Sequence, residues 1–353
     1  MNKKVGIILI NYHDYAKRFL ADCRDSLRRQ DYSREDFQVY IVDNDSSENT
    51  FNYLKQEFPE AIVLGRNDGN YCAANNLGFN EAIKGGSDYL IALNMDTIVD
   101  SKFISEMVQA LENNKESGMA QAKILLHSKE NTEKQKINSL GNVIQYLGFG
   151  FTSAYNEEDR EIDGYPEIKG YASGCAFIIR AEIYTLVGGL NEEYYMYHDD
   201  MELSLKLKMA GYKIILAPKA VVYHKYEFSR SVLMYYYMER NRYLTLLIFA
   251  SKKYLLLIFL PLFFMDLGMF FYSLFTGHFR ELIKIYSYFL KNSTMEKIIK
   301  SRAEIKEITK VPFNNIAQDF KARIEFQEIN NPLLGFVVNP LMSAYWFLIK
   351  KII

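Results

Sequence analysis

Two stretches decide the fold of this chain: FQVYIVDND, residues 37–45, and YLIALNMD, residues 89–96. Each is a run of mainly apolar residues, many of them β-branched or aromatic, that ends at an acidic residue. Such runs are typical of strands buried on both faces of a parallel sheet. Two further strand-like runs occupy residues 5–11 and 61–67. Helical patterns occupy residues 16–30, 49–58, 75–84 and 101–113. Strands that alternate with helices predict an α/β fold with a mostly parallel sheet.

The composition limits the size and partners of the protein. With 353 residues, 49% of them hydrophobic, the chain is long enough for two domains, or for one large domain and an appendage. The net charge of -1 gives no reason to expect nucleic acid as a partner. The three cysteines are widely spaced and odd in number, which favours reduced thiols over a disulfide framework. Residues 127–168 are polar and weakly periodic, which predicts a long loop.

Acidic residues follow the predicted strands at their carboxyl ends. Asp43 ends one run and Asp96 ends another. Ligands of open α/β sheets bind beyond these strand ends, so we expect the carboxylates to converge in one polar cleft. The alternative for each Asp is a helix cap. Asp96 is also a candidate ligand of a divalent cation, and His224, at the end of a later strand-like run, is its plausible partner.

A second acidic pair lies in the block that runs from GYASGCAFIIR, residues 170–180, to YMYHDDMEL, residues 195–203. Asp199 and Asp200 precede a helix predicted over residues 201–210. Asp199 and Glu202 resemble a capping box, which would give Asp199 a structural role. We expect the helix dipole to hold Asp200 ionised, and such a carboxylate can act as a general base toward a hydroxyl. The alternative for Asp200 is dipole complementation alone.

The character of the chain changes after His224. Residues 254–276 are almost entirely apolar and long enough to span a bilayer core of about 30 Å. However, Asp266 lies in their middle, where a membrane disfavours charge, and basic residues flank both ends. A second apolar segment, residues 332–349, ends in two lysines. We expect both segments to lie in the cytoplasmic membrane interface or to form a re-entrant pair. A buried helical subdomain of a soluble protein is the alternative.

Taken together, these motifs resemble the inverting family 2 glycosyltransferases, which have the GT-A fold. The resemblance covers roughly residues 4–225 and rests on five motifs in the family's order. They are IILINYHDY (7–15), VDNDSS (42–47), NYCAANNLG (70–78), LNMDT (93–97) and the block over residues 170–203, followed by the strand with His224. It implies a GT-A, Rossmann-like α/β catalytic domain over residues 1–226 with a mixed, mostly parallel sheet. Residues 227–353 would form a helical, hydrophobic, membrane-associated region.

The resemblance also implies roles for individual residues. Asp200 matches the family's catalytic base. Asp96 matches the metal-binding Asp of its DxD-like motif, and His224 matches a further element of the metal site. The implied cofactor is a divalent cation, Mn or Mg. The residues with implied substrate-binding roles are Asn11, Asp43, Asn75, Asn94 and Asp199.

The implied substrates are a nucleotide-diphosphate sugar donor and a glycan or polyprenyl-linked acceptor at the cytoplasmic face of the cell membrane. The implied process is cell-surface polysaccharide or cell wall synthesis, and the motifs favour a deoxysugar such as rhamnose. A sugar nucleotidylyltransferase or a dinucleotide-dependent oxidoreductase would need a glycine-rich loop after the first strand, where the chain reads NYHDYAK. A non-catalytic, membrane-associated nucleotide-sugar binding subunit stays as the alternative.

Overall fold

The computed structural model describes residues 3–128, 134–226, 232–325 and 332–353. The chain divides into two compact units. The first consists of Met1–Asn142, Thr152–Leu207 and Tyr212–Glu227, and the second of Val143–Phe151, Lys208–Gly211 and Phe228–Ile353. A short segment from the middle of the chain thus belongs to the second unit. The assignment of residues 1–226 to catalysis and 227–353 to membrane association stays a prediction.

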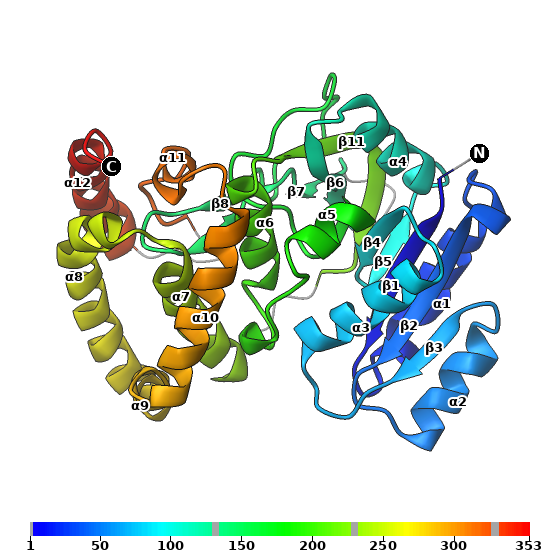
Figure 1. Cartoon of the computed structure of the whole chain (residues 1–353), viewed down its shortest axis with the longest axis horizontal. Helices are drawn as coiled ribbons and strands as arrows, with labels where there is room; N and C mark the ends of the chain where they lie inside the picture. Colours follow the sequence, from blue (N-terminus) through cyan, green and yellow to red (C-terminus); the bar gives the residue numbers. More distant parts are fainter. Residues whose placement is uncertain (1–2, 129–133, 227–231, 326–331) are drawn as a thin grey trace. The chain divides into compact units, whose positions relative to one another are not determined.

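The first unit is built around a large sheet with the strand order β3-β2-β1-β4-β10-β6-β11-β5, in which β7 also pairs with β6 (Figure 1). Its strands are β1 (Val5–Asn11), β2 (Phe37–Asp43), β3 (Ile62–Gly65), β4 (Tyr89–Leu93), β5 (Thr97–Val99), β6 (Ser117–Leu126), β7 (Ile137–Ser139), β10 (Ala176–Arg180) and β11 (Lys213–His224). The ladders β3-β2-β1-β4 and β6-β11 are parallel. Strand β10 pairs antiparallel with β4 and β6, and β5 pairs antiparallel with β11, so the sheet is mixed.

Helices cover the sheet because its central strands are apolar on both faces. The helices of the first unit are α1 (Tyr15–Arg28), α2 (Glu48–Glu57), α3 (Tyr71–Lys84), α4 (Phe103–Asn113), α5 (Ala181–Leu186) and α6 (Asp199–Met209). Alternate residues of β1, such as Ile7, share one buried cluster with residues of α1 and α4. Ile8 points the other way, and a Cβ added at Gly78 of α3 would lie 2.8 Å from its side chain. Only glycine therefore lets α3 pack this close to the sheet.

Residues other than the strand-end carboxylates cap the helices. Ser47 begins α2, where its side chain accepts a hydrogen bond from the backbone of Thr50. Lys102 occupies the position before α4. Neither Asp43 nor Asp96 therefore caps a helix, and the capping alternative for both is wrong.

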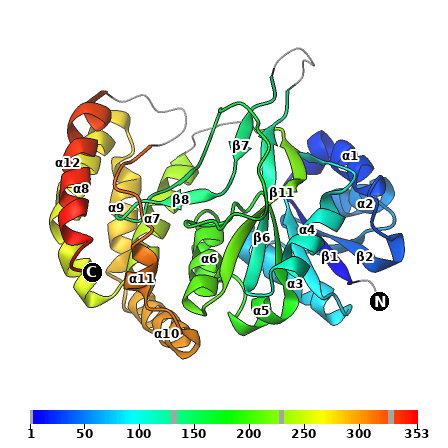
Figure 2. The same ribbon diagram turned by 90° about the horizontal axis from the view of Figure 1, so that it is seen from above.

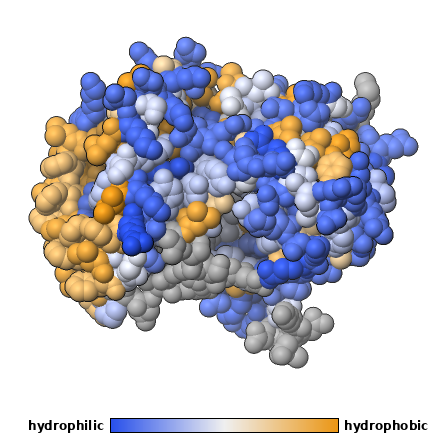
Figure 3. Space-filling view, turned by 90° about the horizontal axis from the view of Figure 1, so that it is seen from below, coloured by the Kyte–Doolittle hydropathy of each residue, from blue (hydrophilic) through white to orange (hydrophobic). Residues whose placement is uncertain are grey.

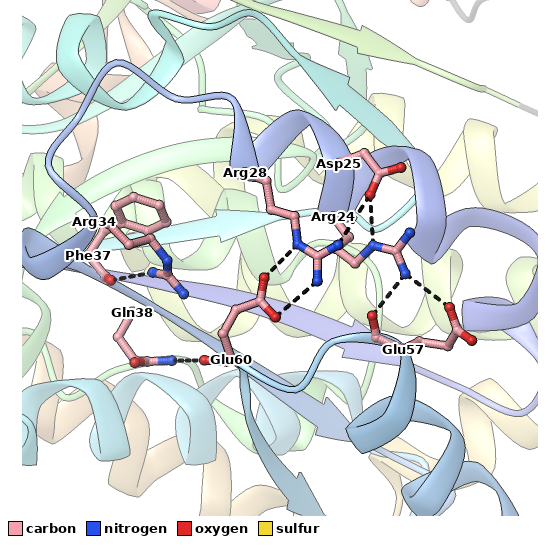
Figure 4. A network of polar contacts seen from close by, with 8 residues as sticks. All are labelled: Arg24, Asp25, Arg28, Arg34, Phe37, Gln38, Glu57 and Glu60. Atoms are coloured by element: carbon pink, nitrogen blue, oxygen red, sulfur yellow. Dashed lines mark hydrogen bonds and ion pairs between the residues drawn. The ribbon is translucent and has the colours of Figure 1, made fainter.

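An ionic network ties α1 to the segment between α2 and β3 (Figure 4). Arg28 donates from Nε to Glu60 Oε1 at 2.6 Å, and Arg24 donates from Nη1 to Glu57 Oε2 at 2.9 Å. The side chains are only partly buried, and exposed pairs of this kind contribute at most about 1 kcal/mol each. The network connects the last residue of α2 and the turn after it to α1.

The prediction of one long loop over residues 127–168 is wrong in part. This stretch contributes β7 to the large sheet, and a separate hairpin pairs β8 (Asn142–Ile144) with β9 (Gly150–Thr152). The strands are only three residues long, too short to show a periodic pattern in the sequence. Strand β7 matters for the candidate site because it carries Asn138.

The second unit is helical. Its elements are α7 (Val232–Phe249), α8 (Lys252–Thr276), α9 (Phe279–Phe289), α10 (Asn292–Ile308), α11 (Phe313–Ala317), a π-helical turn (Leu334–Val338) and α12 (Asn339–Ile349). The inserted segment packs into this unit, because the ring of Tyr146 stacks on Trp346 with centroids 4.8 Å apart. Tyr254 of α8 donates its hydroxyl hydrogen to the Tyr146 carbonyl at 2.8 Å. Figure 2 shows α8 and α12 side by side.

Candidate active site

The carboxyl ends of β1 and β2 place Asn11 and Asp43 opposite each other in the ladder. Asn11 donates from Nδ2 to Asp43 Oδ1 at 2.7 Å, and the Thr50 hydroxyl donates to Asp43 Oδ2 at 2.6 Å. Asp43 is fully buried and both of its oxygens accept hydrogen bonds. The next residue, Asn44, is also buried, and its Oδ1 has no hydrogen-bond partner among the described residues. Asn44 is therefore an available acceptor at this strand end that the sequence analysis missed.

The antiparallel pairing of β5 with β11 brings Asp96 to His224. Thr97 faces His224 in the ladder, and the Lys225 backbone donates to the Asp96 carbonyl at 2.8 Å. The His224 Nε2 lies 3.3 Å from Asp96 Oδ2. Asp96 Oδ1 is buried without a hydrogen-bond partner among the described residues. The two residues that the sequence pairs as metal ligands are thus adjacent.

Asn138 of β7 contacts the other side of the His224 ring. The His224 Nδ1 lies 2.9 Å from Asn138 Oδ1, and both side chains are buried. Because an amide oxygen only accepts, Nδ1 carries a hydrogen and donates it to Asn138, and Nε2 faces Asp96. Sequence reasoning missed Asn138, since it lies in the stretch predicted to be a loop.

The protonation states of Asp96 and His224 depend on each other. Burial works to raise the pKa of Asp96, but the hydrogen bond and charge of His224 outweigh it and lower that pKa. Burial works to lower the pKa of His224, but the neighbouring Cys175 and Asp96 outweigh it and raise that pKa to about 10. At neutral pH the Asp96 carboxylate is therefore ionised and the His224 ring carries a positive charge, so a cation that bound to Nε2 would displace the proton from that nitrogen.

Asp199 and Asp200 begin α6, directly after a strained segment. Tyr195, Tyr197 and His198 all have positive φ angles, of 65°, 63° and 60°, which non-glycine residues rarely adopt. Asp200 accepts hydrogen bonds from two backbone N–H groups, that of Gly174 to Oδ2 at 3.0 Å and that of Met201 to Oδ1 at 2.8 Å. These donors fix the orientation of the Asp200 carboxylate.

One expectation about this pair is wrong. The helix begins at Asp199 itself, and Glu202 forms an ion pair with Lys206 at 2.9 Å, so Asp199 and Glu202 form no capping box. For Asp200, burial opposes the ionised form that the start of the helix favours. Burial raises its pKa to about 6, against the effect of the backbone donors. Burial and the charge of Asp200 raise the pKa of Asp199 to about 8. Burial thus makes it unfavourable for both carboxyls to be ionised together, and the two backbone N–H donors to Asp200 favour the negative charge on Asp200 rather than on Asp199.

A chain of contacts joins the acidic pair to the end of β4. Gly174 contacts Asp200, and the next residue, Cys175, accepts a hydrogen bond from the Asn94 backbone at 2.8 Å. The Asn94 side chain lies 3.4 Å from the Tyr71 hydroxyl. Asn75, by contrast, donates its side-chain hydrogen bond to the Tyr71 carbonyl within α3. The sheet therefore brings the predicted residues to one edge, while Asn75 acts there as a support for α3.

A comparison with known proteins shows the family. Residues 6–186 match glycosyl transferase family 2. The chain belongs to glycosyl transferase family 2. This confirms the family that the motifs indicate.

Two curated proteins are distant relatives of this family 2 chain. It is 35% identical over 74 residues to the N-acetylglucosaminyl-diphospho-decaprenol L-rhamnosyltransferase of Mycobacterium tuberculosis, which covers 21% of this chain and 24% of that protein. It is 22% identical over 200 residues to the O-antigen chain rhamnosyltransferase WbaN of Salmonella anatum, covering 57% of this chain and 60% of that one. The chain thus spans about a quarter of the first relative and three fifths of the second.

Solved structures show the fold of this family 2 member. A crystal structure of GalNAc-T7 with UDP, GalNAc and Mn2+ matches with a TM-score of 0.57 and 13% identity, covering 71% of this chain and 48% of that one. Staphylococcus aureus TarS matches with a TM-score of 0.50 and 14% identity, covering 99% of this chain and 55% of that one. The predicted fold, a mixed, mostly parallel GT-A sheet followed by a helical region, is confirmed.

Proposed function

We propose that this protein is a metal-dependent inverting glycosyltransferase that moves a sugar from a nucleotide-diphosphate donor to a hydroxyl of a glycan or lipid-linked acceptor. The observation that carries the proposal is the acidic pair at the edge of the sheet. Asp199 keeps its proton at neutral pH while Asp200 is ionised and held by two backbone donors. A carboxylate with a pKa near 6 is suited to general base catalysis at neutral pH.

The reaction would be a single displacement. The Asp200 carboxylate accepts the proton of the acceptor hydroxyl, whose oxygen forms the new bond to the anomeric carbon. The bond from that carbon to the diphosphate oxygen breaks on the opposite face, and its electrons leave with the nucleoside diphosphate. The configuration at the anomeric carbon is therefore inverted. Protonated Asp199 adds no second negative charge beside the base.

Asp96 and His224 fit a divalent cation, Mn or Mg. The described residues contain no group of three or more His, Cys, Asp or Glu side chains arranged for a metal ion, so the donor diphosphate would complete the ligand set. The fit rests on the buried Asp96 Oδ1, which has no hydrogen-bond partner in the part of the chain that the structure describes, and on an adjacent imidazole. When bound, the cation would offset the charge that develops on the leaving diphosphate. Asn138 would hold the His224 ring.

The donor would bind at the ends of β1, β2 and β4. Asn11 and Asp43 would shape the base site, where the Asn44 oxygen is available to accept a hydrogen bond. Asn94 would lie near the diphosphate, and Asn75 would support α3. The two rhamnosyltransferase relatives support a deoxysugar such as rhamnose as the transferred group.

The cytoplasmic face of the cell membrane is the proposed location, and cell-surface polysaccharide synthesis the proposed process. Within the described residues, one helix, α8, is long and apolar enough to cross a membrane. A lipid-linked acceptor would be presented at such a surface. The alternative, a non-catalytic membrane-associated nucleotide-sugar binding subunit, would have no need of an ionised carboxylate in a fixed orientation.

A panel of nucleotide sugars tests the function. The full chain in detergent is incubated with each donor and Mn or Mg, with and without a polyprenyl-linked glycan acceptor. We expect one donor to be consumed in a metal-dependent reaction that gives an inverted product, detected by mass spectrometry and NMR. Nucleotide-sugar binding without transfer to any acceptor would favour the binding-subunit alternative instead.

The pH dependence provides a separate test. The pKa of Asp200 is raised to about 6, and the base works only when ionised. Activity is therefore present above that pKa and lost as pH falls through it, about tenfold per pH unit below 6. We expect kcat/KM to rise from pH 5 and level off near pH 7. The Asp199→Asn variant should keep an acidic limb. A flat profile between pH 5 and 7 in a chemistry-limited assay would exclude Asp200 as the base.

A further inference from the structure

Helix α8 leaves most of its apolar surface uncovered in the second unit. Its most apolar window is only 11% buried. Phe259, Phe264 and Phe275 are 63%, 61% and 87% exposed. Hydrophobic side chains gather over the helices of this unit in the space-filling view (Figure 3). A contiguous apolar surface of this kind marks a site of interaction.

The middle of α8 is tied to α7 by a cluster of charges. Arg242 is fully buried and lies 3.5 Å from Asp266 of α8 and 2.8 Å from Glu239. The Tyr243 hydroxyl also donates to Asp266, and Arg242 donates to the Leu147 carbonyl at 3.2 Å. If α8 crossed a bilayer, this cluster would lie near the bilayer centre or lose its partners. Both outcomes are strongly unfavourable, so the cluster opposes a spanning α8.

Helix α12 lies against α8 and extends the apolar surface. The Tyr345 hydroxyl of α12 donates to the Leu257 carbonyl of α8 at 2.8 Å. Leu341 is 67% exposed, and Phe336 of the preceding π-helical turn is 84% exposed. Neither segment is therefore a covered core helix of a soluble subdomain.

Basic residues lie at the edges of this surface. Lys252 and Lys253 begin α8, and Lys351 follows α12 with its ammonium 4.2 Å from the centre of the Phe347 ring. Lys253 also donates to the Ile352 carbonyl, which places the lysines of both helices together. After α8, Arg280 is exposed as well. Cations beside an exposed apolar face complement the anionic head groups above the acyl chains of a bilayer.

We propose that the second unit docks into one leaflet of an anionic membrane, with α8 and α12 in the plane of the interface and neither helix crossing. The exposed phenylalanines and leucines enter the acyl region, and the lysines contact the head groups. The Arg242 cluster stays inside the protein on the cytoplasmic side. This proposal narrows the membrane association proposed above and does not depend on glycosyl transfer.

A cysteine-accessibility experiment tests the topology. The native cysteines are buried, so a single exposed cysteine is added to the full chain, either Ser101→Cys before α8 or Ser293→Cys after it. Both variants are expressed in bacteria and labelled with a membrane-impermeant maleimide. We expect both cysteines to react in inverted membrane vesicles and neither in right-side-out vesicles. Labelling of Ser293→Cys only in right-side-out vesicles would show that α8 spans the membrane and overturn the proposal.

Vesicle flotation of the purified full chain tests whether the apolar surface of α8 and α12 binds a membrane. We expect binding to vesicles that contain phosphatidylglycerol and at least about tenfold weaker binding by Phe259→Asp or Leu341→Asp. Leu186→Asp, on an exposed position of α5, is the matched control and should bind like the wild type. Unchanged thermal unfolding would show that the variants fold. A protein that forms a dimer through this face and does not bind the vesicles would overturn the proposal. This outcome is independent of whether the protein transfers a sugar from any nucleotide-sugar donor.

Discussion

Replacing Asp200 with asparagine is expected to lower kcat by about a hundredfold to ten-thousandfold, the usual contribution of a general base. Asparagine keeps the size of the side chain and one oxygen for the Gly174 or Met201 backbone donors, but it cannot take a proton from the acceptor hydroxyl. The loss should therefore appear in kcat, while the dissociation constant of the donor changes little. Single-turnover kinetics and calorimetric donor binding measure the two effects separately.

The matched control is Asp199→Asn at the adjacent position. Because the pKa of Asp199 is raised to about 8, this carboxyl carries a proton at neutral pH, and an amide resembles its neutral form. We expect kcat to stay within about tenfold of the wild type, since no charge is removed at pH 7. Equal losses in the two variants, or an active Asp200→Asn protein, would contradict the assignment of the base.

Asp96→Asn is expected to have the second largest effect. The asparagine oxygen can still face His224 Nε2, but the charge that would attract a divalent cation is lost. We expect the affinity for Mn in the presence of the nucleotide to fall at least about a hundredfold, since even partners outside the ligand set contribute tenfold to a hundredfold. Electron paramagnetic resonance titration with Mn measures this affinity without any turnover.

A nearby carboxylate provides the comparison for Asp96. Asp100 follows β5, and its Oδ1 accepts a hydrogen bond from the Lys102 backbone at the surface. Asp100→Asn should bind Mn and nucleotide like the wild type. Unchanged Mn affinity in Asp96→Asn would exclude Asp96 as a ligand, and weak Mn binding by the wild type itself would count against the metal site as a whole.

The sequence predicts β1 and β2 residue for residue, but it misplaces the start of α3. The runs at residues 5–11 and 37–43 coincide with β1 and β2, because strands buried on both faces are unbroken apolar runs. Helix α3 begins at Tyr71, four residues before the predicted start at 75. Its first turn reads YCAA, which is too short to show a helical period, and its start is fixed by Asn70, whose side chain accepts a hydrogen bond from the Ala73 backbone.

The candidate site also contains some residues that the sequence locates and others that it does not. Strand-end positions locate Asp43 and Asp96, because parallel strands place their carboxyl ends at one edge, whereas the acidic pair is located by its place at the start of a predicted helix. No local pattern marks Asn138, which comes from a three-residue strand and reaches His224 from 86 positions away. Asn44 likewise shows no signal beyond its place next to Asp43.

The sequence by itself determined the family, the alternation of strands and helices, and the residue types at the strand ends, since these depend on local composition and motif order. Only the tertiary structure decided which side chains of the site are protonated and which form ion pairs. Burial raises the pKa values of both Asp199 and Asp200, and the pairing of β5 with β11 brings Asp96 to His224. It also gives Asp266 its partner in Arg242. Protonation and ion pairing depend on solvent exclusion and on contacts between distant segments, and a linear pattern contains neither.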